Sequence, residues 1–86
     1  MNIYLISQSV NNGYDTFDSA VVAAEDAGCA RFTHPASSWH GISIPRGRKE
    51  WDDTVWCDPS LVEVRLLGKA IEGTPPGVIC SSFNAG

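Results

Sequence analysis

The feature that most constrains the fold is the placement of four short β-type segments along a chain of only 86 residues. Each segment is rich in branched or aromatic apolar residues and is bounded by turn-forming residues, which is the pattern of strands. A chain of this length forms one domain. We therefore expect a single domain over residues 1–86, with strands over residues 3–8, 19–25, 61–70 and 78–83.

One short helix is expected between the second and third strands. Residues 25–34 begin with acidic side chains and carry Arg31 near their end, which suits the helix dipole, and Pro35 stops the helix. The first two strands are expected to pair antiparallel across an extended loop over residues 9–18, where the Asn12-Gly13 pair favours a turn. The predicted fold class is α+β, a small antiparallel four-stranded sheet with one helix in the order β-β-α-β-β.

A long irregular loop over residues 35–59 precedes the third strand and lacks any clear periodicity. Loops of this length are often functional. In the third strand, alternation of apolar and polar residues predicts one buried and one mostly polar face; the apolar set is Val62, Val64 and Leu66 and the other set is Glu63, Arg65 and Leu67. Cys80, inside the apolar fourth strand, is expected in the core, and Trp51 and Trp56 are expected to pack on the open face of the sheet.

Composition excludes several classes of function. The net charge of −4 disfavours direct binding of nucleic acids, because phosphate backbones repel an acidic domain. The longest apolar run, residues 20–24, is far shorter than the roughly 20 residues that span a bilayer, so no membrane association is expected. Three scattered cysteines without C-x-x-C spacing predict reduced thiols in a cytoplasmic protein, with no disulfide framework, no metal site and no cofactor.

No catalytic constellation is recognisable in the sequence. Cys57 or Cys80 with His34 or His40 offers the residue types of a thiol nucleophile and its base, but no glycine elbow or oxyanion-loop signature accompanies them. We therefore expect a binding protein and not an enzyme, with no catalytic residues.

Acidic and aromatic side chains in the two loops form the first candidate binding surface. Carboxylates favour a partner with a basic surface, and exposed tyrosine or tryptophan side chains act as anchors at protein interfaces. The candidate partner-binding residues are Asn12, Tyr14, Asp15, Asp18, Trp39, Asp52 and Asp53.

A basic cluster in the long loop provides the alternative. Arg46, Arg48 and Lys49 carry half of the six positive charges, and arginine side chains hold phosphate groups well. In this interpretation Trp51 stacks on a base, Asn84 binds its polar edges, and the chain sequesters a small nucleotide signal. Homo-oligomerisation is then expected, because 86 residues barely enclose a ligand pocket.

Five short motifs stand out near the two ends of the sequence: YLISQ over residues 4–8, VNNGYDT over residues 10–16, DSAVV over residues 18–22, and GVI and SFNAG over residues 77–79 and 82–86. Together they resemble a family of small uncharacterised proteins of bacteriophages and prophages. The resemblance implies a small accessory protein that acts in the cytoplasm of an infected bacterium, and it assigns no catalytic residue. Our leading hypothesis is a non-enzymatic inhibitor of a host defence system, similar in kind to an anti-CRISPR protein, that occludes a host protein effector.

Overall fold

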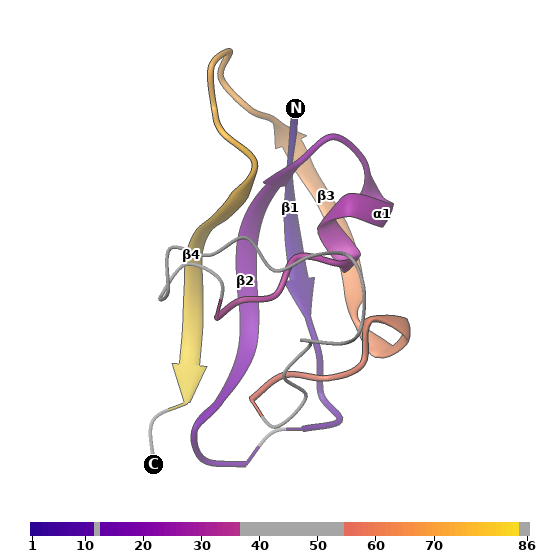
Figure 1. Cartoon of the computed structure of the whole chain (residues 1–86), viewed down its shortest axis with the longest axis vertical. Helices are drawn as coiled ribbons and strands as arrows, with labels where there is room; N and C mark the ends of the chain where they lie inside the picture. The colour runs from indigo at the N-terminus through magenta and orange to yellow at the C-terminus, as the bar shows by residue number, and fades with distance from the viewer. Residues whose placement is uncertain (12, 37–54, 85–86) are drawn as a thin grey trace.

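The structure is a computed structural model that describes residues 1–11, 13–36 and 55–84. It has a four-stranded antiparallel sheet with one short helix, which confirms the predicted small α+β fold (Figure 1). The elements are β1 (Asn2–Ser7), β2 (Thr16–Ala24), α1 (Ala27–Arg31), the 3-10 turn η1 (Pro59–Leu61), β3 (Glu63–Lys69) and β4 (Gly77–Asn84).

The strand order is β3-β1-β2-β4, so the two N-terminal strands form the centre and the two C-terminal strands form the edges. β1 and β2 pair antiparallel, as expected from the loop between them. The connection from β3 to β4, residues 70–76, passes over the end of the sheet where β1 begins (Figure 1). The backbone N–H of Ala70 donates to the carbonyl of Met1 at 3.1 Å, which attaches this connection to the start of the chain.

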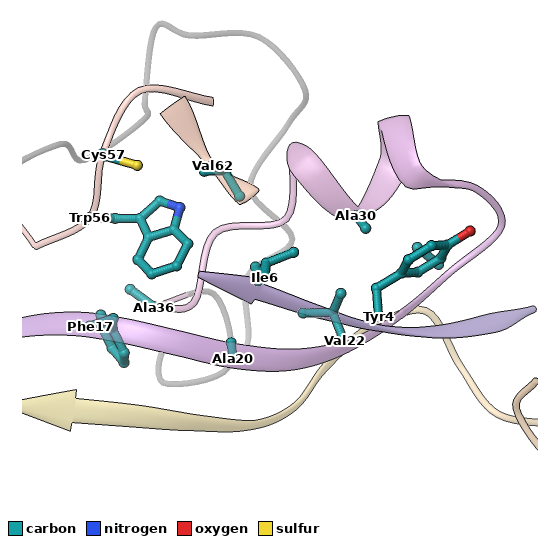
Figure 2. Close-up of a cluster of buried hydrophobic side chains, with 11 residues drawn as sticks. Tyr4, Ile6, Phe17, Ala20, Val22, Ala30, Ala36, Trp56, Cys57 and Val62 are labelled. Carbon is teal, nitrogen blue, oxygen red and sulfur yellow. The ribbon is translucent and has the colours of Figure 1, made fainter. Parts of the chain in front are cut away.

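One face of the sheet carries the core. Ile6 of β1 lies opposite Ala20 of β2, and Tyr4 lies opposite Val22. These four side chains belong to the core cluster and lie on the side of the sheet that carries α1 and Trp56 (Figure 2). Trp56 and Phe17 are both fully buried. Trp56 therefore packs on the face of the sheet that carries α1, and not on the open face where it was expected. Trp51 lies outside the described residues.

Helix α1 is shorter than the predicted helix and begins at Ala27 instead of residue 25. The Asp26 side chain accepts a hydrogen bond from the backbone N–H of Cys29 at 2.8 Å, so this acidic residue caps the helix instead of extending it. The guanidinium of Arg31 donates to the carbonyls of Pro59 and Val62. These bonds connect α1 to η1 and to the residue before β3.

The predicted alternation holds at the start of β3 and fails at Leu66. Val62 is buried and Val64 is partly buried against the core, while Glu63 and Arg65 are exposed. Leu66, expected on the buried face, is 60% exposed, and Leu67 is 51% exposed. β3 lies at an edge, and its register with β1 shifts at Tyr4, so that Leu67 is an extra residue between Leu66 and Gly68. A bulge of this kind breaks the regular alternation of faces.

Two further expectations are corrected in β2 and β4. β2 begins at Thr16 instead of residue 19, because Thr16 and Phe17 pair with Asn84 and Phe83 at the far end of the sequence. Asp18 is an extra residue in this pairing, which hides the strand pattern. Cys80 is exposed and not part of the core, since it lies opposite Val21 on the face away from α1.

Candidate functional site

Four of the predicted site residues lie within the described chain, and they are grouped at one end of the sheet. Tyr14, Asp15 and Asp18 belong to the connection between β1 and β2 and to the start of β2, and Asn84 ends β4 beside them. The other predicted site residues lie outside the described residues; they are Asn12, Trp39, Arg46, Arg48, Lys49, Trp51, Asp52 and Asp53. We call residues 8–11 and 13–18 the β1–β2 loop region.

Gln8 organises the first half of this region from the inside. Its side chain is only 6% exposed. The side-chain oxygen accepts from the backbone N–H groups of Val10 and Asn11, at 3.0 and 2.8 Å. The side-chain nitrogen donates to the carbonyls of Asn11 and Phe17, at 2.6 and 2.8 Å. One buried amide thus holds the turn after β1 against the start of β2.

Two hydrogen bonds attach the same region to the segment around Trp56. The side-chain nitrogen of Asn11 donates to the carbonyl of Trp56 at 2.8 Å. The backbone N–H of Phe17 donates to the carbonyl of Val55, also at 2.8 Å. Because the Trp56 indole is fully buried, these bonds connect the loop region to the hydrophobic core.

The second half of the region is held against the end of β4. The backbone N–H of Asp15 donates to the carbonyl of Asn84 at 2.6 Å. The carbonyl of Gly13 accepts from the Asn84 side-chain nitrogen at 3.1 Å and from the Thr16 hydroxyl at 2.7 Å. Asp15 has φ of 59°, the left-handed conformation that aspartate tolerates better than most residues.

This framework presents exposed apolar and acidic side chains together. The Tyr14 side chain is 79% exposed and Val10 is 60% exposed. Asp15 and Asp18 are exposed on the same stretch of chain. A tyrosine offers a large contact area with only two side-chain torsions to fix, and nearby carboxylates complement basic groups. The arrangement is therefore suited to contacting another macromolecule.

Asn84 belongs to this same site. It was predicted to bind the polar edges of a nucleotide base, with the basic cluster as its companion. In the structure its side-chain nitrogen donates to Gly13, and this bond helps to hold the turn that carries Tyr14. The contacts of Asn84 with Gly13 and Asp15 therefore position the turn that carries Tyr14.

His34 and Cys57 are buried, Cys29 is half-buried, and Cys80 is exposed. His34 is buried, and its Nδ1 accepts from the backbone N–H of Ala36 at 3.0 Å. Burial, and to a lesser extent the charge of Asp58, raises the pKa of the Cys57 thiol from 9.0 to about 11, which disfavours the thiolate that a nucleophile requires. Within residues 1–11, 13–36 and 55–84, no group of three or more potential metal ligands is found.

The sequence pattern missed Gln8, Asn11 and Val10. Gln8 was taken as the last residue of a strand, and nothing local distinguishes a buried amide from an exposed one at that position. Asn11 acts through Trp56, a partner remote in sequence. Val10 did carry a signal, because it is an isolated branched apolar residue within a polar loop.

Comparison of the chain with protein-family models, with curated proteins and with solved structures gives no match. In the part of the chain that the structure describes, no helix is long and apolar enough to cross a membrane.

Proposed function

We propose that this chain is a non-enzymatic binding protein that occludes a protein partner through its β1–β2 loop region. The observation that carries the proposal is the exposure of Tyr14, at 79%, on a loop held by a buried amide and by the end of β4. An aromatic side chain presented by a fixed backbone loses little conformational entropy on binding, so more of its contact energy contributes to affinity.

Charge supports a basic partner surface. The chain has a net charge of −4, and Asp15 and Asp18 follow the exposed tyrosine within four residues. Opposite charges accelerate the encounter of two proteins, and salt screens this effect. The similarity of the sequence motifs to small phage and prophage proteins supports a host protein effector of a bacterial defence system as the partner, with the encounter in the bacterial cytoplasm.

The test starts with affinity purification of the chain from a bacterial lysate, followed by binding measurements with the recovered partner. Tyr14→Ala is expected to weaken binding about tenfold or more, the effect of truncating an anchor residue. The paired substitution Asp15→Asn and Asp18→Asn should mainly lower the association rate and reduce its dependence on salt. Asparagine is chosen because it also tolerates the left-handed backbone at Asp15.

Matched controls come from the opposite end of the sheet. Ile71 is 85% exposed and Glu72 is an exposed acid next to it, in the connection between β3 and β4. Ile71→Ala and Glu72→Gln should leave binding unchanged. If Tyr14→Ala binds as well as the wild type, or if the Ile71→Ala control weakens binding equally, the β1–β2 loop region is not the docking site.

Native mass spectrometry distinguishes the nucleotide-sequestering alternative. The wild-type chain would then retain a nucleotide, and the Arg46→Glu, Arg48→Glu double variant would lose it. This result would contradict protein occlusion and support sequestration of a nucleotide. Turnover of a nucleotide by the pure chain would contradict both functions.

A further inference from the structure

The edge of the sheet formed by β4 differs from the edge formed by β3. β3 contains the charged residues Glu63, Arg65 and Lys69, and charged side chains, lysine above all, protect an exposed edge from pairing. β4 has eight residues and no charged side chain. In the described chain, no strand lies beyond β4 (Figure 1). Its outer backbone groups are therefore a template for another strand.

Two apolar side chains of β4 are also only partly buried. Phe83 packs edge-on against Phe17 with ring centroids 4.9 Å apart, and Val78 lies opposite Val22. Both Phe83 and Val78 pack against the buried core but remain only partly buried themselves. A strand added beside β4 would extend the core layer over these two side chains and remove more of their apolar surface from water.

We propose that β4 pairs antiparallel with β4 of a second copy of this chain, which joins two four-stranded sheets into one continuous sheet. Antiparallel pairing of a strand with itself is self-complementary, because a two-fold axis places the same surface on both partners. The bulge at Ile79 restricts the regular part of the edge to residues 80–84, so the axis lies near Ser82.

The side chains of residues 80–84 suit this pairing. Ser81 and Phe83 lie on the core side of the sheet, opposite Ala20 and Phe17, while Cys80 and Ser82 lie on the other side. With the axis at Ser82, Ser81 of one copy faces Phe83 of the second, and the two Ser82 side chains face each other. Residues 80–84 include no charged side chain, so no like charges face each other within the paired segment.

The pairing places the two docking loops on opposite sides of the two-fold axis. Asn84 lies at one end of β4 and holds the turn that carries Tyr14. An axis near Ser82 reverses the second strand, so Asn84 of each copy faces Cys80 of the other. Tyr14 lies outside the paired residues 80–84, so Tyr14→Ala should leave the dimer intact.

Sedimentation equilibrium of the full chain over a range of concentrations tests the proposal. We expect a mass twice that of the 9.3 kDa chain. Ser82→Lys places two positive charges opposite each other at the axis and should raise the dissociation constant of the dimer about tenfold or more. The matched control is Leu67→Lys, which puts the same charge at an exposed position of the other edge strand and should leave the dimer unchanged.

Hydrogen exchange gives a second readout that requires no substitution. Backbone amides of β4 should become better protected as the protein concentration rises, while those of β3 should not. A monomer at every soluble concentration would overturn the proposal. So would a dimer that Ser82→Lys leaves intact in a folded variant, or a dimer that Leu67→Lys weakens equally.

Discussion

At the scale of single residues, Gln8 connects the fold to the candidate site. Its amide makes four hydrogen bonds to the backbone of Val10, Asn11 and Phe17 while the side chain stays buried. Gln8→Ala removes all four bonds and leaves two N–H groups and two carbonyls without those partners. We expect the free energy of unfolding to fall by about 2–3 kcal/mol, measured by urea denaturation. Ser9→Ala, at the exposed neighbour, should change it by less than about 0.5 kcal/mol.

The buried thiol of Cys57 predicts a loss of stability at alkaline pH. Its pKa is about 11 in the folded chain, against 9.0 for an ordinary cysteine. Between these pH values the Cys57 thiol loses its proton in the unfolded chain but keeps it in the folded chain. The contribution of this thiol to the free energy of unfolding is therefore complete below pH 9.0 and is lost as the pH rises toward about 11. The free energy of unfolding of the wild type should fall more steeply over this range than that of Cys57→Ala.

Thiol labelling checks the same environment independently. At pH 8 an alkylating reagent should modify the exposed Cys80 first and Cys57 last, with labelled positions located by mass spectrometry. Modification of Cys57 at the rate of Cys80 in the folded protein would contradict the burial of that side chain.

At the scale of secondary-structure elements, Arg31 joins α1 to the segment before β3. α1 has only five residues, too few for a helix that is stable alone. The Arg31 guanidinium donates to the carbonyls of Pro59 and Val62. Arg31→Met keeps most of the aliphatic stem but removes both bonds, and should cost about 2 kcal/mol in a chemical denaturation experiment. Arg65→Met, on exposed β3, should have little effect; an equal loss there would show that the cost comes from charge alone.

The local sequence pattern predicts a strand correctly where pairing with a remote strand does not change its bounds or add a bulge. β1 and β4 lie close to the predicted segments, because their apolar residues are nearly continuous. The prediction fails where a remote partner decides the outcome. β3 becomes an edge strand with a bulge at Leu67, and β2 gains three residues from its pairing with the end of β4.

In the candidate site, too, the sequence predicts what local residue types decide and misses what distant partners decide. Tyr14, Asp15 and Asp18 were predicted from residue type within one loop, and the structure places them at one end of the sheet. The residues that hold this loop use partners distant in sequence. Asn84 reaches Gly13, and Asn11 reaches Trp56, so neither role is visible in the local sequence.

At the scale of the whole molecule, the strand order makes folding depend on the end of the chain. Both edge strands come from the C-terminal third and pair with strands from the N-terminal third: Asn2 lies opposite Lys69, and Thr16 lies opposite Asn84. Closing such long loops costs entropy before the contacts form. Refolding followed by stopped-flow fluorescence should therefore take milliseconds to seconds, as is typical of folds with mainly non-local pairing.

The same topology predicts that the sheet does not fold cooperatively without β4. Removing β4 turns the central strand β2 into an edge, and the buried Phe17 ring loses its contact with Phe83. A chain truncated after residue 76 should show no cooperative unfolding transition and little dispersion of its backbone amide signals. The milder variant Phe83→Ala keeps the backbone of β4 and should still fold, with a loss of about 3 kcal/mol. A folded truncated chain would mean that β3, β1 and β2 suffice to form the core, and that β4 is not required for folding.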